Sequence, residues 1–261
     1  MTTEDCIIEL FCRVDDSMKD VPKHPQAHLY PSELVTIGLL FAMKGVGERA
    51  FYRWLERDYR HLFPALPDRT RLFRLLATHR SWTDRFLAEP TVLGVADTYG
   101  IELIHPRREG RSENQIGRKG LSNKRWIVGC KLGFILNQRG LATAWDCDSA
   151  NVSDISFQPL VRQFEERMVV FTDMGFHSKA GDPSNMKPCK KGEWNDRMVV
   201  ETVLSMLTVV CHFKKVGHRV WRYFQARLGF TLAAYNIFVQ WFGLEPNEHG
   251  YIPLSIAEFA L

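Results

Sequence analysis

The stretch that decides the fold is Met168-Val169-Val170-Phe171-Thr172-Asp173, an unbroken apolar run that ends on a carboxylate. Such a run is typical of a β-strand buried on both faces. A second apolar run, Val92-Leu93-Gly94-Val95-Ala96, is followed in the same way by Asp97. The pattern predicts that both carboxylates lie at strand ends and point into a shared crevice.

The residues around these two runs predict a mixed sheet with helices packed on it, preceded by an all-helical region. Within residues 1–90, helical spacing predicts helices that begin at Pro31, break at Gly45 and Gly47, continue through Phe51–Tyr59 and then span about 68–87. Later segments read as strands at 91–96 and 101–104, a hairpin of 126–136 with 141–145, a helix over 156–166 and a short strand near 186–189. We therefore expect an N-terminal helical region of residues 1–90 and an α/β domain of residues 91–261.

The helical region has two interpretations that the sequence leaves open. Several short helices with arginines on their faces are typical of a helix-turn-helix DNA reader. A plain helical bundle explains the same pattern, because nothing in the spacing marks a recognition helix.

Glu201 lies in a helical stretch with two distinct faces. The apolar face consists of Val200, Val203, Leu204, Leu207, Val210 and Cys211. Arg197, Glu201, Ser205 and Thr208 follow at steps of four, four and three, so they form one polar stripe. If the apolar face packs on the sheet, Glu201 can close the crevice of Asp97 and Asp173; alternatively, Arg197 and Glu201 form only a surface ion pair.

Three carboxylates that meet at one point repel each other unless divalent cations lie among them. The trio therefore predicts metal-dependent phosphoryl chemistry. Two other acidic positions, Asp146 and Asp148, are rival candidates near a strand end, but neither ends a buried apolar run. Asn151 and Asp154 are expected to cap a turn or a helix.

Charge is unevenly distributed along the chain. The net charge is +4, and residues 1–90 are balanced, whereas residues 105–131 hold eight basic residues against two acids. A basic loop beside a carboxylate crevice suits an anionic polymer, although a plain solvated loop is the alternative. The basic residues of this segment are Arg107, Arg108, Arg111, Arg118, Lys119, Lys124, Arg125 and Lys131.

Composition argues against a secreted or membrane protein. The six cysteines show neither C-x-x-C pairs nor the spacing of a disulfide framework, which fits a reducing cytosol. The first residues lack the basic and apolar blocks of a signal peptide. The uncharged stretch 228–244 is too short for a membrane span and is expected to be a buried core helix. We expect a cytoplasmic protein of the bacterial cytosol or nucleoid.

Two motifs resemble those of DDE-type insertion-sequence transposases. Asp173-Met174-Gly175-Phe176 is similar to their Asp-x-Gly-aromatic segment, and Trp194-x-x-Arg197-x-x-x-Glu201 resembles their Tyr-x-x-Arg-x-x-x-Glu-x-x-x-x-x-x-Lys signature. Asp97-Thr98 occupies the place that the first aspartate has in these enzymes, at the end of the opening strand of an RNase H-like core. The resemblance covers about residues 91–243. Trp194 replaces the tyrosine and Thr208 the lysine, which affects one phosphate or base contact but not the metal site.

The resemblance implies a DNA transposase that cuts element ends and joins the freed 3′-hydroxyls to target DNA. It implies that Asp97, Asp173 and Glu201 hold two Mg²⁺ ions, with Mn²⁺ as a substitute, and that a homodimer assembles on two element ends. DNA contacts are expected from Arg107, Arg108, Arg111, Lys119, Lys124, Arg197 and His177, although a plain surface role for His177 is the alternative. Two other functions stay open: a hydrolytic nuclease on the same scaffold, and a transposase-derived DNA-binding protein without catalysis.

Overall fold

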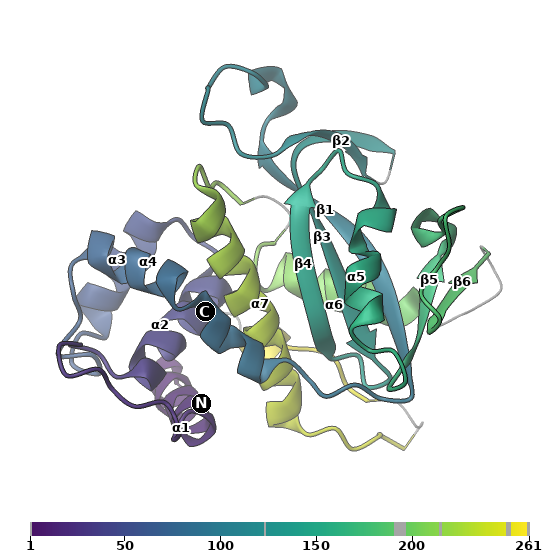
Figure 1. Cartoon of the computed structure of the whole chain (residues 1–261). Helices are drawn as coiled ribbons and strands as arrows, with labels where there is room; N and C mark the ends of the chain where they lie inside the picture. The colour runs from purple at the N-terminus through teal and green to yellow at the C-terminus, as the bar shows by residue number, and fades with distance from the viewer. Residues whose placement is uncertain (1, 123, 191–196, 214–215, 249–251, 260–261) are drawn as a thin grey trace.

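The structure is a computed structural model that describes residues 2–122, 124–190, 197–213, 216–248 and 252–259 (Figure 1). It is a mixed α/β protein, as the sequence predicts, with helices at the N-terminus and a curled sheet flanked by helices.

The N-terminal helices follow the predicted pattern closely. Helix α2 starts at Pro31, whose fixed φ suits a first helical position, and ends where Gly45 adopts a left-handed φ of 64°. The helix expected over 68–87 is instead interrupted at His79, after which the chain continues as a 3₁₀-helix. The elements are α1 (Thr3–Ser17), α2 (Pro31–Lys44), α3 (Glu48–Asp58), α4 (Arg69–Thr78) and η1 (Arg80–Phe86).

The sheet combines antiparallel and parallel pairs. Its strands are β1 (Leu93–Ile104), β2 (Arg118–Ser122), β3 (Arg125–Asn137), β4 (Ala142–Ser149), β5 (Val169–Asp173) and β6 (Met186–Cys189). The order is β2-β3-β1-β5-β6, with β4 also paired to β3. Strand β3 is antiparallel to β1, β2 and β4, whereas β5 is parallel to both β1 and β6.

Three details of the sheet correct the sequence prediction. The two strands expected at 91–96 and 101–104 are one strand, because β3 pairs with β1 along almost its whole length. Part of the expected basic loop forms β2. Strand β5 is not buried on both faces: Val170 and Thr172 point inward, whereas Val169 is 41% exposed.

Helices cover both faces of the sheet. The helix expected over 156–166 is shorter than predicted and consists of η3 (Asp154–Phe157) and α5 (Gln158–Arg162). It packs Phe157 and Val161 into a small core with Ala96 and Ile135. Helices α6 (Arg197–Val209) and α7 (Trp221–Phe242) contribute to the larger core on the opposite face. The remaining short 3₁₀-helices are η2 (Pro106–Arg108), η4 (Met174–Phe176) and η5 (Ala257–Phe259).

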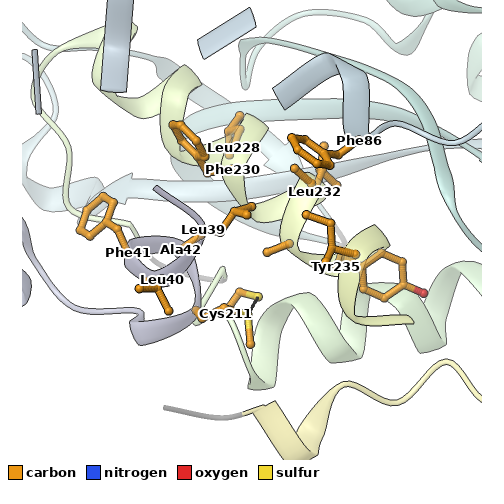
Figure 2. Close-up of a cluster of buried hydrophobic side chains, with 14 of the residues drawn as sticks. Leu39, Leu40, Phe41, Ala42, Phe86, Cys211, Leu228, Phe230, Leu232 and Tyr235 are labelled. Carbon is orange, nitrogen blue, oxygen red and sulfur yellow. Dashed lines mark hydrogen bonds between the residues drawn. The ribbon is translucent and has the colours of Figure 1, made fainter. Parts of the chain in front are cut away.

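Helix α7 connects the N-terminal helices to the sheet, and lies between them in Figure 1. One continuous buried cluster runs from α1 and α2 through α7 to β1, β3 and β4. In the close-up of Figure 2, Leu39 and Phe41 of α2 lie in the same cluster as Leu228 and Phe230 of α7. The domain boundary expected near residue 90 stays a prediction.

Asn236 links three elements within this core. Its side chain accepts a hydrogen bond from the backbone N–H of Ala142 on β4 and donates to the carbonyls of Ala142 and Phe86. The uncharged stretch around it is a buried core helix, as predicted. Within the described part of the chain, no helix has both the length and the apolar character needed to cross a membrane.

Candidate active site: the carboxylate edge

The pairing of β1 with β5 places Asp97 and Asp173 at the same level on neighbouring parallel strands. The last registered pair is Val95 with Phe171, and each aspartate lies two residues further along its strand. Because strand side chains alternate between faces, both carboxylates project from the same face of the sheet. The structure therefore brings together the two strands that the sequence marks with terminal acids.

The position of Asp97 differs from the prediction in one respect. Asp173 is the last residue of β5, but Asp97 lies in the interior of β1, which continues to Ile104. Pairing with β3 extends the strand past the aspartate, and Asp97 itself lies opposite Phe134. The two carboxylates therefore lie at the end of β5 and along the side of β1.

Local hydrogen bonds hold both carboxylates. Asp97 is half-buried, and its Oδ1 accepts from the backbone N–H of Thr98 at 2.6 Å. Asp173 is exposed, and its Oδ1 accepts from the backbone N–H of Gly175 at 2.9 Å, so it caps the short helix η4. The Asp-x-Gly spacing therefore has a structural role, because the glycine N–H orients the carboxylate.

A third acidic residue, Asp154 rather than Glu201, lies beside Asp173, but it contacts the face of the sheet opposite Asp97, because its partner Thr98 points away from the Asp97 side. Asp154 accepts at Oδ1 from the hydroxyl of Thr98 and from Nζ of Lys131, each at 2.9 Å. A β-carbon built on Gly175 would lie 2.7 Å from Oδ2 of Asp154 and 3.0 Å from Oδ1 of Asp173. We call Asp97, Asp154 and Asp173 the carboxylate edge.

Sequence reasoning assigned Asp154 to capping, and the structure corrects this. Ser153 is the residue that caps η3, through its side-chain oxygen. The partners of Asp154 are 56 and 23 residues away in the sequence, so no local pattern could identify them. The rival acids Asp146 and Asp148 are exposed, and each accepts a hydrogen bond from the next backbone N–H.

Glu201 lies on the helix that covers the face of Asp97. Val200 and Val203 of α6 are buried in the same core against which Val95 of β1 packs, on the Asp97 side of the strand. Glu201 and Ser205 are exposed, as the two-faced pattern predicts. Arg197 is the first residue of α6, but its side chain and the whole of Trp194 lie outside the described residues.

The donor chemistry fits a divalent cation, but the donors are not gathered into a complete site. Carboxylate oxygens of Asp97 and Asp173 are the ligands that Mg²⁺ prefers. Among the residues that the structure describes, no group of three His, Cys, Asp or Glu side chains is arranged to hold a metal ion. The metal site of Asp97, Asp173 and Glu201 stays a prediction.

The basic segment is divided by the fold. Lys131 lies on β3, its side chain only 12% exposed, and it pairs with Asp154; Arg125 pairs with the buried Glu102. Lys124 lies in the turn before β3 with a φ of 61°, and Lys119 lies over the exposed ring of Trp126 at 5.3 Å. Two of the eight basic residues are therefore used in ion pairs within the sheet.

Arg107, Arg108 and Arg111, which we call the loop arginines, are exposed. They line a hollow of about 720 Å³ together with His105 and residues 217–219. A β-strand rises about 3.3 Å per residue, so Ile104 at the end of β1 lies roughly 23 Å along the strand from Asp97. The hollow is therefore separate from the carboxylate edge and lies at the other end of the same strand.

His177 is about half exposed, and its Nδ1 lies 2.7 Å from Oδ2 of Asp182. Hydrogen bonds from the backbone N–H of Ser178 and from His177 lower the pKa of Asp182. A DNA contact by His177 would have to compete with this pair, so its DNA-binding role stays a prediction.

All six cysteines are free thiols, in agreement with the spacing argument.

Two comparisons with known proteins add no family assignment: no protein-family model matches the chain, and a search of curated proteins finds no significant relative.

Proposed function

We propose that the chain is a DNA transposase of the DDE type, which cuts the ends of a mobile element and joins the freed 3′-hydroxyls to target DNA. The observation that carries the proposal is the β1–β5 register, which sets Asp97 and Asp173 side by side on one face of the sheet. Helix α6, with Glu201 on its exposed side, covers that face. By resemblance, an RNase H-like core pairs its opening strand with the strand that carries the second aspartate, as β1 and β5 pair here.

In this proposal the chain's own residues bind and orient the substrate. Asp97 and Asp173 would hold Mg²⁺ or Mn²⁺ with Glu201, and the bound ions would activate the attacking oxygen and neutralise charge on the leaving one. The loop arginines would contact phosphates beyond the cut site. Backbone N–H groups of Thr98 and Gly175 donate to the carboxylates of Asp97 and Asp173 and so orient them.

One observation favours a second candidate, a transposase-derived DNA-binding protein without catalysis. The described acidic side chains form no three-membered metal group. A chain that had lost catalysis would keep the sheet and the arginines but would not need to gather its carboxylates.

The experiment that separates these functions uses DNA carrying the element's terminal repeats, with and without Mg²⁺. Joined products are expected from the wild-type protein. Asp97→Ala should reduce cutting more than about 100-fold while DNA binding persists, because even outer-shell partners of metal ligands are worth about 10- to 100-fold.

Asp148→Ala is the matched control, because it removes an exposed aspartate from the same sheet. Cutting without joining would identify a nuclease, and binding without cutting would identify the second candidate. If Asp97→Ala cut as well as Asp148→Ala does, the active-site assignment would be wrong.

A further inference from the structure

A second hollow, of about 790 Å³, lies where the N-terminal helices meet the segment before α7. We call it the arginine hollow. Its lining includes one histidine, His218, and the charged residues Arg49, Arg69, Arg219, Arg227 and Glu48. Four arginines against one glutamate make this a strongly positive concave surface.

The arginines at the rim are available to an external anion. Arg49, Arg69 and Arg219 are exposed. Within the described part of the chain, none of them takes part in an ion pair; on the N-terminal helices Arg13, Arg57, Arg60 and Arg85 pair with acids, whereas Arg53, Arg71 and Arg74 are unpaired as well but lie outside the hollow. Like charges gathered without internal partners repel each other, so a bound anion would relieve the repulsion.

Arg227 of α7 forms the floor of the arginine hollow and is only 5% exposed. Its Nη1 donates to the carbonyl of Val46 at 3.1 Å, and the guanidinium lies over the ring of Phe41. Among the residues that the structure describes, its Nε has no hydrogen-bond partner and the guanidinium has no ion pair. A buried guanidinium with so few described partners is incompletely satisfied, since charged groups are rarely buried without a counter-charge.

The N-terminus of α3 opens into the same hollow. The helix begins after Gly47, which provides no side-chain cap, and a β-carbon built on Gly47 would meet nothing within 4 Å. The first-turn residues Glu48, Arg49 and Ala50 line the hollow. The N–H groups of a first turn lack intrahelical acceptors and favour negative charge.

Glu48 is the one acidic group in the lining, and it acts as an internal competitor. Burial raises the pKa of its carboxyl, while the nearby Arg69 and Arg227 oppose that shift. Burial lowers the pKa of His218 to about 4, so this histidine is neutral at pH 7. At neutral pH the balance of charge in the hollow therefore favours an anion.

The arginine hollow adjoins the hollow of the loop arginines, because Gly217, His218 and Arg219 line both. Together they form a basic track from α3 to the loop after β1. A free anion needs only one pocket, whereas a track with repeated arginines suits a polymer with repeated phosphates.

We propose that the arginine hollow binds a backbone phosphate of DNA, held by the N-terminus of α3 and by Arg49, Arg69 and Arg227. The choice of DNA as the source of the phosphate rests on the proposed function. It would make the N-terminal helices, together with the loop after β1, one continuous DNA-binding surface.

The test measures binding of a labelled 20-base-pair duplex without divalent metal, over a series of salt concentrations, and binding of inorganic phosphate alone. Arg49→Ala/Arg69→Ala should weaken duplex binding about tenfold or more. The slope of log affinity against log salt concentration should become shallower by up to about 1.8. Arg53→Ala/Arg74→Ala is the matched control, because it removes two exposed arginines from the same helices but outside the hollow.

Glu48→Gln is expected to change binding in the opposite direction from the arginine substitutions. Removing the internal competitor should tighten binding of both duplex and phosphate, whereas Glu56→Gln, further along α3, should have a smaller effect. Thermal unfolding of each variant verifies that it is folded.

The proposal is overturned if the two double variants weaken duplex binding equally, or if Glu48→Gln binds no tighter than Glu56→Gln. If Arg49→Ala/Arg69→Ala abolished the binding of inorganic phosphate but left duplex binding unchanged, the phosphate bound in the hollow would not come from DNA. Because no cutting is measured, failure of these experiments is distinct from failure of the Asp97→Ala test.

Discussion

The carboxylate edge and the arginine hollow both gather like charges, but the protein treats them in opposite ways. Asp97, Asp154 and Asp173 each accept hydrogen bonds from within the chain, and Asp154 also has an ion-pair partner. At the arginine hollow, the described structure contains no ion pair for Arg49 or Arg69. The acids are held by hydrogen bonds within the chain, whereas Arg49 and Arg69 are exposed and have no ion pair among the described residues.

The difference indicates separate tasks for the two regions. A carboxylate group that performs chemistry must be held in a narrow range of geometries before the substrate arrives. A phosphate-binding surface gains most of its affinity from charge and needs less precise geometry. The predictions below test whether the loop arginines act through charge and whether the acids and the buried groups act through position.

The largest effect is expected from replacing all three loop arginines by alanine. If each contacts a phosphate, the slope of log affinity against log salt should become shallower by up to about 2.7. Duplex binding over a salt series measures this. A triple variant of Arg13, Arg57 and Arg60, which already form ion pairs with acids on the same chain, is the control. Equal slopes for the two triple variants would remove the loop from the interface.

The second effect concerns the carboxylate edge. Lys131→Met should destabilise the fold by about 1–3 kcal/mol, because Asp154 loses its cation while only 24% of its side chain is exposed. Chemical denaturation measures the loss. Lys131→Met/Asp154→Leu should recover part of it, since an apolar pair leaves no uncompensated charge.

Arg167→Gln is the control for this prediction, because it breaks the exposed pair with Glu89 and should change stability by less than about 1 kcal/mol. If Lys131→Met costs no more than Arg167→Gln, the pair does not hold Asp154 in place.

The third effect, expected only below pH 6.5, is a pH dependence from His218, beside Arg227. Burial lowers the pKa of His218 to about 4, below its ordinary value of 6.5. Between these values the unfolded chain binds a proton that the folded chain does not. Stability contributed by the neutral histidine is therefore complete above pH 6.5 and falls by up to about 1.4 kcal/mol per pH unit as the pH drops towards 4.

Denaturation curves of the wild type and of His218→Gln between pH 7 and pH 4 measure this contribution. The wild type should lose more stability than the variant over that range. Parallel losses would show that the folded-state pKa of His218 is not lowered.

Much of the fold is predictable because its signals are local. Pro31 and Gly45 mark the ends of α2, and the turn at Asn137–Gly140 joins the hairpin strands, where Gly140 has a φ of 72°. The two faces of α6 follow directly from residue spacing. Errors occur where pairing overrides the local pattern, as in β1, which continues past Asp97 because β3 supplies partners for it.

The candidate site was only partly predictable for the same reason. Asp97 and Asp173 each follow an apolar run, so local pattern identifies them. Asp154 has no such mark, because its contacts with Thr98 and Lys131 form only when the sheet and η3 come together. The count of Lys131 among the free charges of the basic segment was wrong for the same reason, since charge counting cannot detect an ion pair across 23 residues.

The sequence by itself determined the class of each main element, the helix boundaries marked by proline and glycine, and two of the three acids of the carboxylate edge. Tertiary structure alone decided the β1–β5 register, the place of Asp154 beside Asp173, and the convergence of arginines from α3, α4 and α7 on one hollow. Periodicity and turn chemistry act over a few neighbouring residues, whereas charges gather through packing of segments far apart in the chain.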